Sequence, residues 1–401
     1  MSSFQVAGPL VWSSSMIFGS FVVGTIAVVA RSWGEGDRAR AEKTVAVSLS
    51  MAAVLGSVLG GLLALGAPFA VGLFGLPAQA AGAAITYLRV VASFFPFLFV
   101  AYTGVAVLRS SGDTRTPLLL AIVANVVNIL GNYGLIFGRW GLPEWGIYGA
   151  GLASGVAHAI EASLLLVVLV RGRRGLRLIP SRFFQGPPVL RSILRISFPS
   201  FVERVFFHAG FLIFAGMVTR LGELASAANQ ACIALESFSF IPAGAFGIAG
   251  ATIIGQKLGA RLPDQARIGG AWAVWMSVGF LSFMGLLYLT IPGSLVALFS
   301  RDPQVLALAV PCLMIAALAQ PTMAVGISLS EGLKGAGDTR SPLIITLIGI
   351  WGVRLGASWL LAYRLGLGLP GIWLATALDW AVRATLLLVV FRRGHWVRIK
   401  V

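Results

Sequence analysis

Residues 108–117 read Leu-Arg-Ser-Ser-Gly-Asp-Thr-Arg-Thr-Pro, and residues 333–342 read Leu-Lys-Gly-Ala-Gly-Asp-Thr-Arg-Ser-Pro. The two copies are 225 positions apart (333 − 108), which is more than half the length of the chain. Each copy lies between two long apolar stretches. A short polar motif that recurs at this distance in an apolar chain indicates a duplicated bundle of helices.

The composition excludes a soluble domain. Of 401 residues, 58% are hydrophobic and only 11% are charged, whereas a soluble domain holds about 25% charged residues. The apolar runs repeatedly reach the roughly 20 residues that cross a lipid bilayer. The net charge of +16 does not indicate nucleic acid, because the basic residues cluster in short loops between apolar spans. We therefore expect the lipid bilayer as a partner, and no nucleic acid.

The apolar pattern predicts an all-α polytopic membrane protein with eleven spans. They lie at about 5–30, 44–74, 82–108, 117–138, 147–170, 192–219, 226–256, 268–299, 305–333, 342–363 and 371–391. Every second connection is rich in Lys and Arg, and such connections stay in the cytoplasm. Because the C-terminal segment 392–400 is one of them, we expect a cytoplasmic C-terminus.

The two halves of the chain do not match span for span. Residues 149–172 resemble 371–394, and the first span corresponds to the second span of the C-terminal half. We therefore expect a six-plus-six architecture of two pseudo-symmetric bundles, in which a helix matching 192–219 precedes this chain's first span. The predicted division is an N-terminal lobe at 1–170, a cytoplasmic linker at 171–190 and a C-terminal lobe at 191–401.

Several motifs together resemble the multidrug and toxic compound extrusion (MATE) family over almost the whole chain. They are the paired Gly-Asp-Thr-Arg loops, Val28–Gly34, Asn125–Asn132 and Phe198–Glu203. The resemblance implies a secondary active antiporter that exports hydrophobic, cationic drugs or toxins in exchange for protons or sodium. It implies no enzyme activity and no cofactor besides the coupling ion. It also implies that the protein is a monomer in a cell membrane such as the bacterial cytoplasmic membrane.

Two carboxylates within the spans are candidates for ion coupling, since an ionisable residue in a membrane span is costly and usually functional. Glu203 follows Pro199, which loosens the helix backbone, and relatives that use the C-terminal lobe carry an acid at this position. Glu236 either completes a carboxylate pair with Glu203 or lines the cavity alone. The alternative for Glu203 is a structural pair with Arg204 or His208.

Amide and aromatic side chains are the candidates for the substrate cavity. Asn125, Asn128 and Asn132 share one helix face at a spacing of i, i+3 and i+7, and either bind substrate or lock neighbouring helices. Proton-coupled relatives carry an Asp at the position of Asn132, so this amide does not carry a proton. The remaining cavity candidates are Asn229, Gln230, Phe201 and Phe238.

The repeated loop motif is formed by Gly112, Asp113 and Arg115 in the first copy and by Gly337, Asp338 and Arg340 in the second. Glycine permits a left-handed turn, aspartate caps the following helix, and proline suits its first turn. The motif therefore predicts a helix-joining turn on the cytoplasmic side, or a hinge or latch.

Other charged pairs are expected to be structural. They are Glu331 with Lys334, Asp379 with Arg383, and His158 with Glu161. The sequence contains no metal-ligand spacing, so no metal site is expected. Two alternatives stay open: a flippase for a lipid-linked precursor, with Arg89, Arg204, Arg354 and Arg383 facing an anionic headgroup, and an inactive truncated paralogue. An integral membrane enzyme is disfavoured because the three histidines lie on separate segments.

Overall fold

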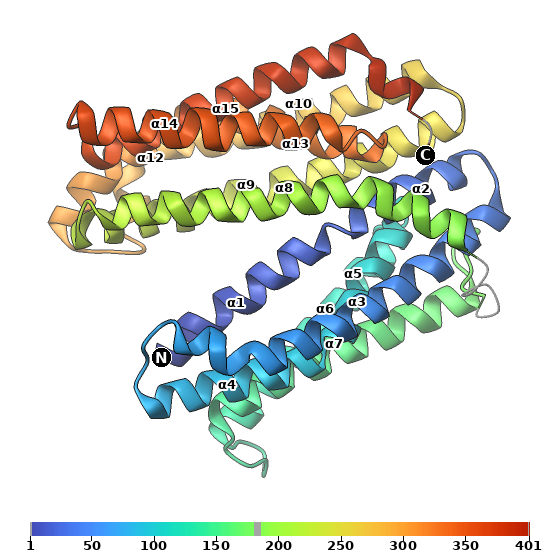
Figure 1. The fold of residues 1–401 in the computed structure, drawn as a ribbon, viewed down its shortest axis with the longest axis horizontal. Helices are drawn as coiled ribbons and strands as arrows, with labels where there is room; N and C mark the ends of the chain where they lie inside the picture. The colour runs from blue at the N-terminus through green and yellow to red at the C-terminus, as the bar shows by residue number, and fades with distance from the viewer. Residues whose placement is uncertain (1, 180–185, 400) are drawn as a thin grey trace. The chain divides into compact units, whose positions relative to one another are not determined.

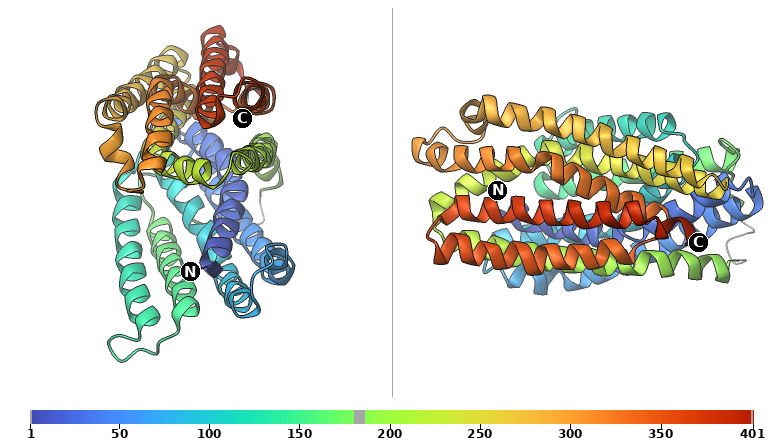
Figure 2. Two further views of the ribbon diagram at one scale, coloured as in Figure 1. Left: turned by 90° about the vertical axis from the view of Figure 1, so that its left-hand side faces the viewer. Right: turned by 90° about the horizontal axis from the view of Figure 1, so that it is seen from above.

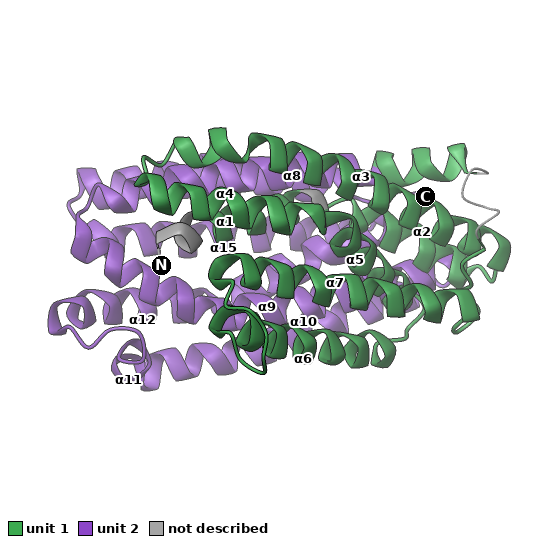
Figure 3. Ribbon diagram, turned by 90° about the horizontal axis from the view of Figure 1, so that it is seen from below, with its two compact units in different colours: residues 1–195 green, residues 196–401 purple. Residues whose placement is uncertain are grey.

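The structure, a computed structural model, describes residues 2–179, 186–399 and 401. All regular structure in these residues is helical, apart from one isolated bridge between Arg173 and Leu176. The chain forms two compact units, Met1–Arg195 and Ile196–Val401, which are coloured green and purple in Figure 3. The predicted all-α fold is therefore confirmed.

The first unit holds the helices drawn from blue to green in Figure 1. They are α1 (Ser2–Gly19), α2 (Val22–Gly34), α3 (Arg38–Gly72), α4 (Ala78–Ser93), α5 (Phe95–Ser110), α6 (Arg115–Phe137) and α7 (Gly146–Arg171). Within this unit α3 packs against α4 and α5, and α6 packs against α7. The shared core is built from small and aliphatic side chains such as Ala46, Leu88 and Leu165, all of which are fully buried.

The second unit begins inside α8 (Pro187–Thr219). The helices that follow are α9 (Glu223–Gly259), α10 (Pro263–Thr290), α11 (Pro292–Val296), α12 (Pro303–Gly335), α13 (Arg340–Leu347), η2 (Ile348–Arg354), α14 (Leu355–Ser358), η3 (Trp359–Arg364), α15 (Gly368–Arg393) and η4 (His395–Arg398). Helix α12 is central, since it contacts α9, α10 and α15. Figure 2 shows these long helices of the unit running side by side.

The helices are long and apolar enough for a multi-pass membrane protein. Ten of those described qualify as spans, and the number rises to eleven if α4 and α5 count as one bent span. The pair bends by 50° at Phe94, and Pro96 occupies the first turn of α5. Because Pro96 has no backbone N–H to donate to the carbonyl of Ala92 four residues earlier, and its ring clashes with that turn, the predicted span at 82–108 is broken there.

The segment between the two predicted lobes is only partly described. Residues 180–185 of the predicted linker 171–190 lie outside the described residues. After α7 the chain turns back, and the backbone N–H of Leu178 donates to the carbonyl of Leu169. The boundary between the compact units falls at Arg195, inside α8.

Close packing of α12 depends on glycine. A Cβ atom on Gly335 would overlap the backbone of Ala251 in α9, and one on Gly247 would come within 2.9 Å of the Glu331 Cβ. Small residues at such crossings let helix backbones approach within a membrane. The glycines therefore fix where the polar end of α12 lies against α9.

Candidate functional site

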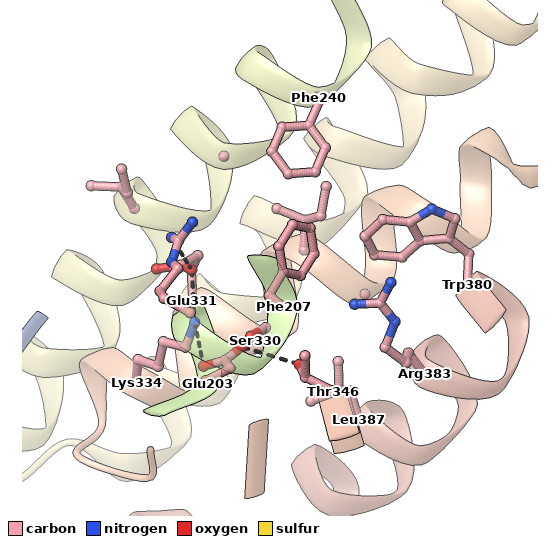
Figure 4. A pocket seen from close by; sticks show the side chains of 15 residues that line it. Glu203, Phe207, Phe240, Ser330, Glu331, Lys334, Thr346, Trp380, Arg383 and Leu387 are labelled. Carbon is pink, nitrogen blue, oxygen red and sulfur yellow. Dashed lines mark hydrogen bonds and ion pairs between the residues drawn. The ribbon is translucent and has the colours of Figure 1, made fainter. Parts of the chain in front are cut away.

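A cavity of about 150 Å³ lies within the second unit. It is enclosed by α8, α9, α12, α13 and α15. Figure 4 shows its side chains, with Glu203, Glu331 and Lys334 together on one side and Arg383 beside Trp380 on the other. Phe207, Phe240 and Trp380 give it an aromatic wall.

Glu203 of α8 is the buried carboxylate of this cavity, with 7% of its surface exposed. Its Oε1 atom accepts a hydrogen bond from the Thr346 hydroxyl at 3.1 Å. Its Oε2 atom lies 3.1 Å from the Lys334 Nζ atom. The ion-pair partner of Glu203 thus comes from α12, whereas the local alternatives weighed from the sequence were Arg204 and His208.

Lys334 is shared between two carboxylates. Its Nζ atom lies 3.0 Å from Glu331 Oε1, the predicted i,i+3 pair, and also contacts Glu203 as described above. Arg204 approaches the same Glu331 oxygen at 3.9 Å. The Lys334 side chain is only 4% exposed. A buried charge requires a partner, and the two acids together provide it. The dashed lines in Figure 4 mark these contacts.

A second ion cluster lies on α15. Asp379 is fully buried and pairs with Arg383, the predicted i,i+4 pair, at 2.7 Å. Arg354 of η2 adds a further contact to the same Asp379 oxygen at 2.8 Å. The Arg383 guanidinium lies over the Trp380 ring, 4.0 Å from its centroid, a cation–π geometry. Arg383 therefore lines the cavity, and Asp379 on the same helix balances its charge.

The structure does not bring the other second-unit candidates to this cavity. Glu236 lies on α9 and is not among the residues that line this cavity, so its role in coupling stays a prediction. Phe238 is 58% exposed, and Phe201 stacks on Phe198 with ring centroids 6.5 Å apart. Near the start of α9, Asn229 is buried and Gln230 is exposed.

The asparagine stripe belongs to the first unit and joins two helices. Asn132 donates to the Asn128 side chain at 3.0 Å, and Asn128 donates to the Ser154 hydroxyl of α7 at 3.1 Å. Asn125 instead donates to the carbonyl of Ala121 in its own helix. Two of the three amides thus form a side-chain connection between α6 and α7, as expected for a helix lock.

The two copies of the loop motif fold alike. Gly112 and Gly337 have φ angles of 79° and 92°, a conformation that favours glycine. Asp113 accepts from the Thr116 backbone N–H at 3.1 Å, and Asp338 accepts from the Ser341 backbone N–H at the same distance. Arg115 and Arg340 begin the helices that follow. The predicted helix-joining turns are therefore present.

Asp113 also has a hydrogen-bond partner outside its own turn. The Thr116 hydroxyl donates to its Oδ2 atom at 2.8 Å, and Arg173, beyond the end of α7, donates to the same atom at 2.9 Å. Burial raises the pKa of this carboxyl, but the hydrogen bonds from Thr116 and Arg173 outweigh burial and hold the pKa below its ordinary value. The turn is thus tied to the end of α7 by a charged contact.

Comparison with known proteins decides the family. The family model described as MatE matches residues 1–134 and 199–360. The chain belongs to the MatE family. The match covers both compact units, so the chain is a membrane transporter of the multidrug efflux type, as the sequence motifs predicted.

Relatives and solved structures agree with this assignment. A probable multidrug resistance protein NorM of Thermotoga maritima is 29% identical over 99% of this chain and 85% of its own length. A probable NorM of Brucella suis is 32% identical over 69% of this chain and 60% of its own length.

Among solved structures, a MATE protein in the bent conformation has a TM-score of 0.91 at 18% identity. It is matched over 99% of this chain and 88% of its own. A transporter of the MOP superfamily from Pyrococcus furiosus, described as having a binding pocket of reverse polarity, matches with the same TM-score, identity and coverage. These structural matches show the fold.

Proposed function

We propose that this protein exports hydrophobic organic cations in exchange for protons or sodium ions by alternating access, and that Glu203 is the coupling residue. The observation that carries the proposal is a buried carboxylate inside a partly aromatic cavity of a MatE transporter. An ionisable group in such a place is expensive and marks an ion pathway. The negative charge of Glu203 binds the coupling ion and the cationic substrate alternately.

The size of the cavity limits what it holds. Drug-sized ligands occupy pockets of about 300–1,000 Å³, and this cavity is about 150 Å³. We therefore assign to it the coupling ion and the charged group of the substrate, with Phe207 and Phe240 beside that group. When Glu203 takes up the coupling ion it loses the charge that attracts the substrate, so substrate release follows ion entry.

The orientation follows from the charged loops. We assign the repeated turns and the C-terminus to the cytoplasm, because the basic connections gather on that side, and we place the protein as a monomer in a cell membrane such as the bacterial cytoplasmic membrane. Glu236, Asn229 and Gln230 are proposed as secondary contacts along the substrate path outside the cavity.

The test uses the purified full chain in liposomes, with uptake of ethidium followed by its fluorescence on trapped DNA. A proton or sodium gradient is imposed. We expect gradient-driven uptake by the wild type, and uptake by Glu203→Gln that falls to the leak of empty liposomes. Glu223→Gln, an exposed acid at the start of α9, is the matched control and keeps wild-type uptake. Full gradient-driven uptake by Glu203→Gln overturns the proposal.

A lipid-linked precursor flippase is the second candidate. Three cationic side chains, those of Arg204, Lys334 and Arg383, line the cavity, and an anionic headgroup would meet them there. Each of the three lies beside a carboxylate, which favours the cation exporter. Two results together would favour the flippase. Ethidium uptake would not depend on an imposed gradient, and an added anionic polyprenyl phosphate would inhibit that uptake.

A further inference from the structure

The ammonium group of Lys334 occupies the position between two carboxylates that a bound cation would take. It lies 3.1 Å from Glu203 Oε2 and 3.0 Å from Glu331 Oε1. The cavity therefore already contains a cation, and that cation is covalently attached to α12.

Three of the four carboxylate oxygens have a contact with a neighbouring polar group. Glu203 Oε1 accepts from the Thr346 hydroxyl, Glu203 Oε2 makes an ion pair but no hydrogen bond with Lys334, and Glu331 Oε1 contacts both Lys334 and Arg204. A metal cation needs a set of free oxygen ligands around it. A proton needs one lone pair on one oxygen, and it leaves the other contacts in place.

The charges that surround this position come from three helices. Glu203 and Arg204 lie on α8, Glu331 and Lys334 on α12, and Arg383 on α15; α13 contributes the Thr346 hydroxyl, and α9 contributes uncharged residues. The two acids are thus opposed by three bases, of which Arg383 is also matched by Asp379. A sodium ion would lie beside the Lys334 ammonium and would depend on carboxylate oxygens alone, whereas an organic cation also contacts the faces of Phe207 and Phe240.

We propose that Lys334 is a tethered counter-ion that sets ion selectivity, so that this cavity accepts protons and excludes sodium. The proposal rests on the proposed function and deepens it. A proton from the outer side binds a Glu203 carboxylate oxygen, the contact from Lys334 to Glu203 is lost, and Lys334 stays with Glu331. The same proton later leaves Glu203 toward the cytoplasm, and Lys334 returns to both carboxylates.

The experiment compares two forces in proteoliposomes: a sodium gradient at equal pH, and a pH gradient without sodium. The variants are Lys334→Met, Lys334→Gln and Lys334→Arg. Lys334→Gln is a second neutral variant that keeps hydrogen-bonding capacity, and it replaces Lys334→Met if that variant does not fold. Lys257→Met is the control, because the Lys257 ammonium contacts Gln265 outside the cavity.

We expect wild type, Lys257→Met and Lys334→Arg to transport ethidium on a pH gradient alone. Lys334→Met and Lys334→Gln gain transport on a sodium gradient, and sodium raises their thermal unfolding midpoint in detergent. A purely structural role for Lys334 would lower that midpoint without making it depend on sodium.

Two results overturn the proposal. One is sodium-driven transport by the wild type with Lys334 in place. The other is a folded Lys334→Met or Lys334→Gln variant whose unfolding midpoint and transport do not respond to sodium. If the wild type responds to neither gradient, the proposed function fails, and the sodium dependence of the unfolding midpoint still decides the role of Lys334.

Discussion

Asp113 joins the turn between α5 and α6 to the chain beyond α7, and its charge is needed for that contact. The carboxyl is 2% exposed and accepts from Thr116 and Arg173. Since its pKa is lowered in the folded state, its stabilisation is present above the ordinary aspartate pKa of about 3.9 and is lost as the pH falls through the lower folded value.

We expect Asp113→Asn to lower the free energy of unfolding by about 1–3 kcal/mol at pH 7, because charged hydrogen bonds are lost in a buried setting. Thermal unfolding in detergent at pH 7 and at pH 3 measures this. The difference between variant and wild type shrinks at the acid pH. An equal difference at both pH values would show that the charge is not responsible.

Asp379 forms ion pairs with two arginines, Arg354 and Arg383. Replacing it with Asn leaves Arg354 and Arg383 buried without a counter-charge, and breaking a buried pair costs about 3–5 kcal/mol. We expect a large drop in the thermal unfolding midpoint of Asp379→Asn. The exposed Asp264 is the control, and its change to Asn costs at most about 1 kcal/mol. Equal midpoints for the two variants would contradict the assignment.

The crossing of helices α9 and α12 determines where Lys334 lies in the candidate site. Gly335 precedes the turn and follows Lys334 directly, and a Cβ there would overlap the Ala251 backbone. Overpacking costs about 1–3 kcal/mol, and it would also move Lys334 away from its partners. We expect Gly335→Ala to lower the unfolding midpoint and to reduce ethidium transport.

Gly356→Ala is the matched control for this change, because no atom lies within 4 Å of a Cβ at that position. It is expected to keep the wild-type midpoint or to raise it slightly, since alanine favours a helix. Similar losses in both variants would mean that the close approach of α9 and α12 is unimportant.

The helices themselves were predictable, because long apolar runs between basic loops have few alternatives in a membrane. The turns at Asp113 and Asp338 were predictable too, since capping depends on residues three positions apart. The bend at Phe94 was missed, although Pro96 carries the signal. The π-helical geometry of η2 and η3 leaves no clear mark in the residue pattern.

The partners of Glu203 were not predictable from the sequence. Thr346 is 143 positions away, and the sequence paired Lys334 with Glu331 alone, at the start of a motif that predicted a cytoplasmic turn. Lys334 is buried because α12 continues as far as Gly335. The only available signal was its place in the repeat, where the first copy carries Arg109. Contacts between distant helices depend on packing, which the spacing of residues does not specify.

At the scale of the whole molecule, the two units share the turn but differ in their polar interiors. The first unit carries the uncharged link from Asn132 through Asn128 to Ser154 and the pair of His158 with Glu161. The second carries the charged group of Glu203, Lys334 and Glu331 around a cavity. A proton can be gained and lost by a carboxylate but not by an amide. We propose that ion coupling resides in the second unit, where Glu203 is the buried carboxylate of the cavity, and that the amides of the first unit lock α6 to α7.

The most direct test of that placement is the pH dependence of ethidium binding to the purified protein in detergent, measured by fluorescence anisotropy. If proton and substrate compete for Glu203, wild-type affinity weakens steadily as the pH is lowered. The Glu203→Gln variant then binds weakly at every pH, with no slope. The same pH dependence of ethidium affinity in wild type and Glu203→Gln would contradict the proposed role of Glu203. It would mean that another residue couples proton and substrate.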